Sequence, residues 1–395
     1  MNAPLSRYPV LLLALAAVSA AAAGNPTIEE RLLALERQVQ TLAAENAQLK
    51  QQLGWKESTP PVLAQPGGKE TKVTVGGFLQ GQAEFGHASD TRWNGVKDRF
   101  FFRRARIYVA GSFAEDFDFK AELDLQGNTL GASTGNLARA NEIYLNWHRY
   151  PFANVRFGQL KPAYGSEALA SDTQILTVER SLANDRLTDG RQLAAGIAGD
   201  LFDRKLSYLV IVANGNGANV SANDNAKFQK SARLTWVPVA TARDRLTLGI
   251  DGLWTEDVNL AKLDLGLPGN LFTGSRRMAG ADLAWNHGRF DFSAEWLHGT
   301  FRPVAALPAA NFAAEGWQAT AAWYVIPGKL RAVVRAEAFD PNTAVGGNTI
   351  RTRTLGLNYY VKGEDIKLML DYLNGDGSGS TTAGSRLLTR LQLIF

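Results

Sequence analysis

The last stretch of the chain, residues 385–395 (SRLLTRLQLIF), decides the fold class because it alternates apolar and polar residues at nearly every step. Leu387, Leu391 and Phe395 share one face, and the basic residues between them share the other. A period of two is typical of a β-strand whose faces meet different surroundings. The same alternation continues from Thr71 to the end of the chain. Clear further examples are residues 117–126, 245–255 and 365–374.

These strands predict a membrane-spanning barrel rather than a soluble sandwich. Nearly every strand has one charged face and one aliphatic or aromatic face over about ten residues, which is the length and pattern of a transmembrane barrel strand. A soluble sandwich also alternates, but its apolar faces meet in a shared core. The predicted fold class is therefore all-β, with an antiparallel transmembrane barrel over residues 71–395.

The connections between the strands predict how many there are. Seven are abrupt, and eight are longer and rich in Gly, Asn, Asp and Thr, so that seven plus eight connections join sixteen strands. The abrupt ones lie at 114–115, 150–153, 201–203, 238–242, 286–288, 326–328 and 362–364. The longer ones lie at about 86–98, 128–137, 162–189, 214–225, 256–275, 300–313, 340–348 and 375–384. Short turns at one end and long loops at the other are typical of an outer-membrane barrel, and sixteen strands enclose an aqueous lumen.

The N-terminus predicts export. Residues 10–18 (VLLLALAAV) are too short to span a bilayer as a helix, but Arg7 before them and the small residues 19–23 after them are typical of a signal peptide over residues 1–23. The alternative is a buried N-terminal helix. A net charge of +4 would fit a nucleic-acid binder, but the bases alternate with acids, so we expect no nucleic-acid partner.

Residues 24–53 carry a heptad pattern that predicts a short coiled coil. Leu32, Val39, Asn46 and Leu53 occupy its a positions, and such a stripe needs partner helices. We therefore interpret it as a trimerisation segment, with a lone amphipathic helix packed on its own domain as the alternative. Residues 54–70 concentrate Pro and Gly without periodicity, which predicts a flexible linker.

The longest loop, residues 161–189, is the first candidate for a functional segment. Structureless loops of this length are usually functional, and in large barrels a loop at this position commonly folds into the lumen. Its charged residues would then lie where the pore is narrowest. The alternative is an external flap with a solvated polar surface.

Residues 99–109 concentrate arginine on one strand. Arg104 and Arg106 should face the lumen, since successive side chains point to opposite sides of a strand. Arg103 then falls on the lipid side near the rim, or at an irregularity. The apolar residues expected to face lipid are Phe101, Ala105, Ile107 and Val109.

Lumen-facing bases continue on other strands and favour anion passage. Guanidinium groups match oxyanions, and a charge turned to lipid at mid-depth would cost about 2–4 kcal/mol. Acids at lumen positions are nearly as numerous, however, so mixed charge that only wets the lumen and pairs strands is the alternative.

The sequence offers no catalytic constellation. Its four histidines lack metal-ligand spacing, no cysteine is present, and no hydroxyl nucleophile has a convincing histidine partner. We therefore expect no enzyme activity, no metal site and no cofactor.

Taken together, these motifs resemble the phosphate-selective porin O and P family of Gram-negative outer membranes. The resemblance rests on the signal peptide, the heptad segment, the GGF of residues 76–78, the FRRAR of residues 102–106 with Gly111, the FGQLKP of residues 157–162, the Glu179-Arg180 pair and the terminal Phe395. It implies a homotrimer of sixteen-stranded barrels that carries phosphate or polyphosphate along a basic pathway to a constriction site. It also implies that the barrel-assembly machinery reads Phe395.

One departure limits that implication. In phosphate-binding members a Lys and adjacent Ser residues precede the Arg of the Glu-Arg pair, whereas this chain has Ala168, Ser171 and Asp172 before Arg180. Ser171 matches, the Lys is missing and an acid intrudes, which argues for a looser anion pore.

The sequence thus predicts a passive outer-membrane diffusion channel that prefers phosphate, polyphosphate or similar small oxyanions. Its expected partners are two further copies of the chain, outer-membrane lipid, the assembly machinery and small inorganic anions. The alternatives are a general or weakly cation-preferring pore, and a structural barrel that tethers the outer membrane to the cell wall. The predicted anion-pathway residues are Arg104, Arg106, Lys120, Arg156, Lys161, Ser171, Arg180, Arg233, Arg331, Arg335, Arg386 and Arg390.

Overall fold

The computed structural model describes residues 71–87, 90–126, 138–262, 264–304, 310–376 and 383–395. The predicted signal peptide (1–23), coiled coil (24–53) and linker (54–70) lie outside these described residues. Among the residues that are described, no helix is long and apolar enough to cross a membrane.

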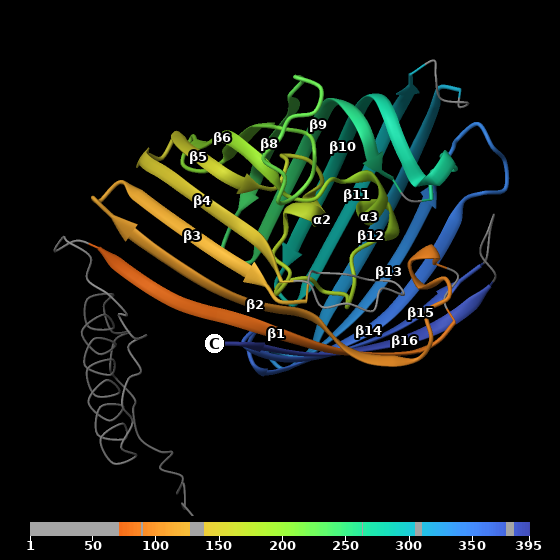
Figure 1. Cartoon of the computed structure of the whole chain (residues 1–395). Coiled ribbons are helices and arrows are strands. Elements are labelled where there is room, and N and C mark those ends of the chain that lie inside the picture. Colours follow the sequence, from red (N-terminus) through yellow and green to blue (C-terminus); the bar gives the residue numbers. More distant parts are fainter. Residues whose placement is uncertain (1–70, 88–89, 127–137, 263, 305–309, 377–382) are drawn as a thin grey trace, which may run out of the picture. The chain divides into compact units, whose positions relative to one another are not determined.

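Sixteen antiparallel strands form a closed barrel (Figure 1). Each strand pairs with its neighbours in the sequence, and the ring closes where β1 pairs with β16, with Phe78 opposite Ile394. The main chains of Gly77 and Phe395 exchange two hydrogen bonds of 2.9 and 3.0 Å at this seam. The predicted sixteen-stranded, all-β barrel is therefore confirmed. The strands are β1 (Lys72–Gly86), β2 (Arg99–Phe113), β3 (Phe117–Asp124), β4 (Arg139–Tyr150), β5 (Ala153–Leu160), β6 (Gln192–Leu201), β7 (Leu206–Ala213), β8 (Gln229–Ala240), β9 (Asp244–Ala261), β10 (Leu271–His287), β11 (Phe290–Pro303), β12 (Phe312–Ile326), β13 (Leu330–Asp340), β14 (Ile350–Lys362), β15 (Ile366–Gly375) and β16 (Gly384–Ile394).

Short turns and long loops alternate around the ring, as predicted. The turn between β12 and β13, for example, places Gly328 at a φ of 68°, a left-handed conformation that a residue without a Cβ adopts at low cost. Two predicted loops were too long. Residues 256–275 shrink to 262–270, because β9 continues to Ala261 and β10 begins at Leu271, and residues 300–313 shrink to 304–311, because β11 continues to Pro303 and β12 begins at Phe312. The longest connection joins β5 to β6 through residues 161–191.

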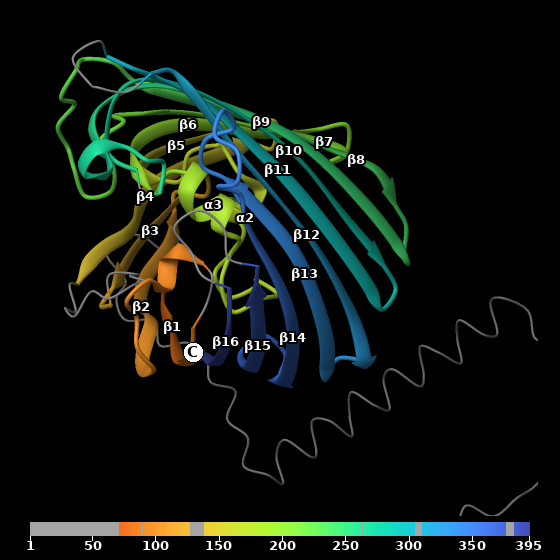
Figure 2. The same ribbon diagram turned by 90° about the vertical axis from the view of Figure 1, so that its right-hand side faces the viewer.

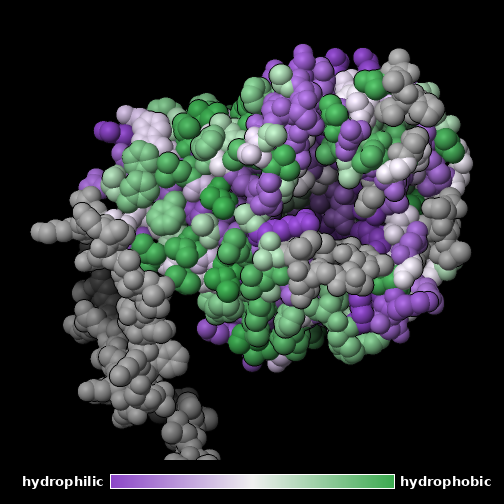
Figure 3. Space-filling view, in the orientation of Figure 1, coloured by the Kyte–Doolittle hydropathy of each residue, from purple (hydrophilic) through white to green (hydrophobic). Residues whose placement is uncertain are grey.

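The two faces of each strand differ as the alternation predicts. In β14, Leu355 and Leu357 lie on the outer face, while Thr354 and Asn358 are buried on the inner one. The space-filling view shows hydrophilic residues inside the hollow and hydrophobic residues on the visible outer face (Figure 3). An apolar outer face requires lipid, and a polar inner face tolerates water.

An irregularity in β2 overturns part of the predicted pattern. Its pairing with β1 shifts between Gln80 and Gly81, where Arg103 is the extra residue of a β-bulge. A bulge reverses which side chains point inward, so Phe102 is 51% exposed on the outer face, and Phe101 lies on the inner face. The expectations that Phe101 faces lipid and that Arg103 lies on the lipid side are therefore wrong. Arg103 is buried inside the barrel, and the anticipated irregularity is what turns it inward.

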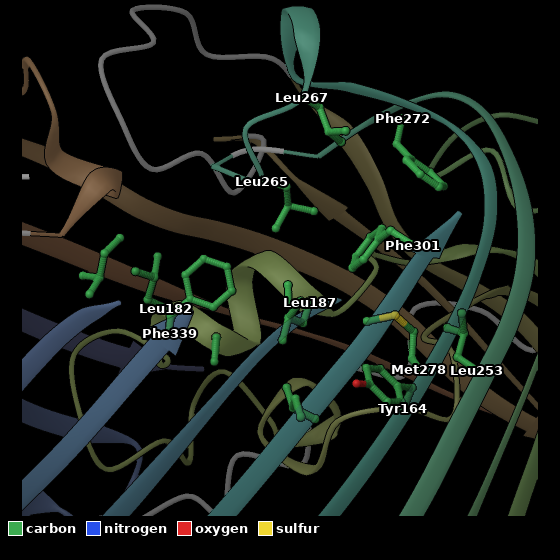
Figure 4. Close-up of a cluster of buried hydrophobic side chains, with 14 residues drawn as sticks. Tyr164, Leu182, Leu187, Leu253, Leu265, Leu267, Phe272, Met278, Phe301 and Phe339 are labelled. Atoms are coloured by element: carbon green, nitrogen blue, oxygen red, sulfur yellow. The ribbon is translucent and has the colours of Figure 1, made fainter. Parts of the chain in front are cut away.

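One sector of the lumen is apolar and packed, which the alternation did not predict. Inward-facing residues of β9 to β14 form a buried cluster with the helix α3 (Leu182–Leu187) of the long loop (Figure 4). A Cβ on Gly316 of β12 would lie 2.5 Å from the Cβ of Ala183, so only glycine lets α3 approach the strand this closely. The members of this apolar cluster include Tyr164, Leu182, Leu187, Leu253, Phe272, Met278, Leu297, Phe301, Phe339 and Ile350.

Candidate permeation pathway

Residues 161–191, here called the inner loop, lie within the ring of strands rather than over its mouth. Both ribbon views show α3 and the short helix α2 (Ser166–Leu169) inside the barrel (Figure 2). The Ser181 side chain caps α3 by accepting a 3.2 Å hydrogen bond from the amide of Asn184. The Ser181 hydroxyl in turn donates to Glu167 at 2.6 Å, which ties the two helices together.

Asp172 of the inner loop lies at the centre of an arginine cluster, here called the Asp172 cluster. One of its oxygens accepts from Arg106 at 2.6 Å, and the other contacts Arg180 at 2.5 Å and Arg104 at 3.2 Å. Burial alone would raise the pKa of Asp172, but the positive charges of Arg104, Arg180 and Arg106 outweigh it and hold the pKa well below its usual range. Asp172 is therefore ionised at neutral pH.

Glu179 occupies a second arginine cluster further along the same loop. Its carboxylate contacts Arg103 at 2.8 Å and Arg390 at 2.6 Å, and it accepts from Gln82 at 3.2 Å. Arg335 donates to the Glu179 carbonyl at 2.8 Å. Burial would raise the Glu179 pKa, but Arg103 and Arg390 lower it, so this residue also carries a full negative charge. Asp172 and Glu179 thus each neutralise arginines of the barrel wall.

An open cavity remains between the inner loop and strands β2 to β7. Its volume is about 690 Å³, and we call it the basic cavity. Its charged wall residues are the bases Lys120, Arg156, Lys161 and Arg191, the acids Glu122 and Glu142, and the ion pair of Arg106 with Asp172.

The bases of this cavity are only partly neutralised. Lys120 lies 2.7 Å from Glu122 and 3.1 Å from Glu142. Arg191 is 3.6 Å from Glu142, and its Nε is buried without a hydrogen-bond partner. Arg156 stacks over the Tyr144 ring at 4.2 Å, and among the described residues no carboxylate lies within 4 Å of it. The cavity therefore carries more positive than negative charge.

Lys161 is held by main-chain oxygens rather than by an acid. Its ammonium donates to the carbonyls of Ala168 at 2.6 Å and Ala170 at 3.2 Å, and in the described part of the chain it forms no ion pair. Burial, together with the nearby charge of Arg191, lowers the pKa of Lys161 to about 7. Its charge therefore changes close to neutral pH. Ser171, nearby on the cavity wall, shares a 2.9 Å hydrogen bond with the Thr173 hydroxyl.

A comparison with known families decides the classification. Residues 79–395 match the sequence profile described as phosphate-selective porin O and P. The chain belongs to this porin family. The predicted family is therefore confirmed, and the family supports the predicted outer-membrane compartment.

Individual relatives are more distant. A region of 264 residues is 24% identical to porin O of Pseudomonas aeruginosa, and it covers 66% of this porin and 57% of that relative. This porin thus spans little more than half the length of the curated relative it matches.

Solved structures share the fold of this porin. The outer-membrane channel DcaP of Acinetobacter baumannii superposes with a TM-score of 0.58 at 14% identity, over 84% of this chain and all of that one. The anion-selective porin of Comamonas acidovorans gives a TM-score of 0.56 at 12% identity, over 82% of this chain and all of that one. OmpT of Vibrio cholerae, in a trimer form, gives 0.56 at 10% identity, over 83% of this chain and all of that one.

The predicted pathway residues of this porin separate into two groups. Lys120, Arg156, Lys161, Ser171 and Arg106 line the basic cavity. The others do not line it, and each is engaged in an ion pair. Arg180 and Arg104 hold Asp172, Arg390 holds Glu179, Arg335 contacts Glu167 at 3.1 Å, Arg386 contacts Glu84 at 3.1 Å, Arg331 pairs with Asp291, and Arg233 contacts Asp251 and Asp282 at 2.5 and 2.6 Å.

Sequence reasoning missed several lumen bases, and three of them show why. Arg191 follows the predicted end of the loop at 189 by two residues, so it fell between loop and strand. Arg103 was expected on the lipid side near the rim or at an irregularity, and it was not counted among the pathway residues because the bulge was not placed. Arg92, in the short helix η1 (Thr91–Trp93), reaches into the barrel and contacts Asp90 at 2.5 Å and the inner-loop Asp185 at 2.7 Å. A single arginine beside an acid gave no pattern that could have identified it.

Within the described residues, no group of three or more His, Asp or Glu side chains is placed to hold a metal ion.

Proposed function

We propose that this porin is a passive, anion-preferring diffusion channel for phosphate, polyphosphate or similar small oxyanions. The basic cavity carries the proposal: it is the open space beside the inner loop, and Arg156, Lys161 and Arg191 lack the close carboxylate partners that neutralise the other lumen bases. Such bases attract anions, and weak, multiple contacts also let the anions leave. The channel needs no cofactor and catalyses no reaction.

We further propose that the porin works as a homotrimer in the outer membrane. Porins of this fold include one solved in a trimer form, and the heptad segment would bring three chains together. In this proposal residues 1–23 direct export, and the barrel-assembly machinery recognises Phe395. The aromatic side chain of Phe395 is 65% exposed, and therefore open to such contact.

The reversal potential of single channels in a KCl gradient tests the proposal. We expect the potential to have the sign of chloride preference. A preference for potassium would establish the general or weakly cation-preferring pore instead, which the many ion-paired lumen arginines favour as the second candidate. A purified protein that inserts into planar bilayers but conducts no ions would support the structural-anchor alternative.

A further inference from the structure

The Asp172 cluster has the composition of an oxyanion site whose ligand is part of the chain. We propose that Asp172 is a built-in anion that occupies the site formed by Arg104, Arg106 and Arg180, and that it thereby keeps this porin from binding phosphate tightly. This inference rests on the proposed function, because it explains how an anion pathway passes phosphate without trapping it. Asp172 is thus a specificity-determining residue.

The geometry around Asp172 is that of a bound anion. Its two oxygens receive three guanidinium groups at 2.5, 2.6 and 3.2 Å, and the residue is only 6% exposed. Charge-assisted contacts of this length are those by which arginines bind carboxylate or phosphate oxygens. A phosphate in place of the carboxylate would meet the same three donors.

The cluster also has more donors than Asp172 can satisfy. The Nη2 atom of Arg106 and the Nε atom of Arg104 are buried without a hydrogen-bond partner. Asp124 accepts a hydrogen bond of 2.9 Å from the Nε atom of Arg106 and leaves the Nη2 atom unpaired. A carboxylate offers two oxygens where phosphate offers four, so the unsatisfied donors fit a larger oxyanion better than they fit the aspartate.

The site is reachable from the pore. Arg106 and Asp172 both form part of the wall of the basic cavity, and Lys161 and Ser171 lie on the same wall. An oxyanion that enters the cavity therefore meets the edge of the Asp172 cluster, and it can take the position of the carboxylate once that carboxylate is removed.

The carboxylate is not required to hold the inner loop in place, because main-chain hydrogen bonds also attach this part of the loop to the barrel wall. Gln80 donates to the main-chain carbonyl of Asp172 at 3.0 Å. Gln392 and Lys367 each donate to the carbonyl of Thr173 at 3.0 Å. These main-chain bonds remain when the side chain of residue 172 is shortened.

Planar-bilayer recordings of the full-length protein with Asp172→Ala test the inference. Chloride current in KCl is titrated with inorganic phosphate, and the phosphate concentration that blocks half of the current is compared with that of the unmodified protein. We expect this concentration to fall at least about tenfold, because the three arginines become available to phosphate. The isosteric Asp172→Asn should act in the same direction, and adding Arg104→Ala to Asp172→Ala should remove most of the gain.

Asp282→Ala is the matched control. It also removes a lumen carboxylate from an arginine that keeps a second acid, since Arg233 retains Asp251, and so it changes the net charge equally. An equal shift in this control would mean that charge alone is responsible, and would overturn the inference. So would a rise in conductance without block by phosphate, or a failure of both Asp172 variants to assemble, since either would make Asp172 a tether.

The two proposals fail separately. The reversal potential of the unmodified protein decides its anion preference, whereas the difference in phosphate block between the Asp172 and Asp282 variants decides the role of Asp172. A cation-preferring pore in which Asp172→Ala gains phosphate block would retain the inference and refute the proposed function.

Discussion

The two sides of the inner loop differ in kind. Toward β2 to β7 the loop leaves the basic cavity of about 690 Å³, whose wall is charged and open to ions. Toward β9 to β14 it presents α3 to the apolar cluster, whose buried side chains pack against the helix. The first side is arranged to meet solutes, and the second side is arranged to hold the loop.

This difference explains how a sixteen-stranded barrel can have a narrow and off-centre pathway. Burial of Leu182, Leu187 and the facing aromatic residues stabilises the loop by the hydrophobic effect, which is not screened by salt. Ion pairs of Glu179 with Arg103 of β2 and Arg390 of β16, and the main-chain hydrogen bond from Gln80 to Asp172, then fix its opposite edge. The apolar side therefore determines where the loop lies, and the charged side determines what passes.

Breaking the apolar side should have the largest effect. Leu187 is fully buried in the apolar cluster, and a carboxylate placed there by Leu187→Asp would be buried without a partner, at a cost of several kcal/mol. We expect the inner loop to leave the wall and the single-channel conductance to rise by about twofold or more, because an unobstructed barrel of this size is an aqueous channel. Conductance in planar bilayers measures the effect.

Val345→Asp provides the control, since Val345 is 49% exposed in the loop before β14. It introduces the same charge outside the cluster and should leave the conductance near that of the unmodified protein. An unchanged conductance for Leu187→Asp would show that the ion pairs alone hold the loop.

The fold was largely predictable because lipid and water impose a strict period of two. The seam near Phe78 and Ile394 and nearly all of the turns follow from that alternation. The bulge at Arg103 was not placed, because one extra residue changes the facing of every neighbour while the sequence of polar and apolar residues stays locally plausible. The apolar sector was missed for a different reason, since Leu253 and Phe301 occupy lumen-facing positions at which the alternation predicts polar residues.

The site was less predictable than the fold. Lumen parity identified Lys120 and Arg156, which do line the cavity, but it could not say which lumen bases are neutralised. That depends on contacts between residues far apart in the sequence, such as Arg390 with Glu179. The intrusion of an acid at position 172 was visible in the sequence, whereas its three arginine partners became visible only in the structure.

Removing the weakly paired bases of the basic cavity should have a smaller effect, and it tests the charged side of the comparison. Arg156→Ala combined with Arg191→Ala leaves Glu122 and Glu142 facing fewer bases, so the anion-to-cation permeability ratio should fall. A unit charge about 4 Å from an ion is worth about 1 kcal/mol in water, which is roughly fivefold in local ion concentration, and salt reduces the effect. We expect a two- to fivefold fall, measured as a reversal potential.

Arg204→Ala serves as the comparison variant, because Arg204 is exposed in the turn between β6 and β7, away from the basic cavity. It removes one positive charge from the same protein and should change the ratio little. Equal changes in both variants would mean that the basic cavity is not the pathway.

The smallest effect should be a pH dependence of the anion preference, and it should arise only on the basic-cavity side of the inner loop. Burial and the nearby Arg191 lower the pKa of Lys161 to about 7, so Lys161 is charged below that pH and neutral above it. Anion preference should therefore decrease as the pH rises from about 5.5 to about 8.5, by up to about twofold, since a single positive charge is lost from the cavity wall. The neighbours that set this titration are Arg191, Asp172, Arg180 and Glu142.

Two substitutions at Lys161 assign the pH dependence to this residue. Lys161→Arg keeps its charge over the whole range and should remove the decrease, whereas Lys161→Met should show the high-pH selectivity at every pH. If Lys161→Arg retains the pH dependence of the unmodified protein, another group must titrate in the pathway. The same decrease should persist when Thr320, a buried inner-face residue of β12 on the opposite side of the inner loop, is replaced by alanine, because that side takes no part in attracting the ion.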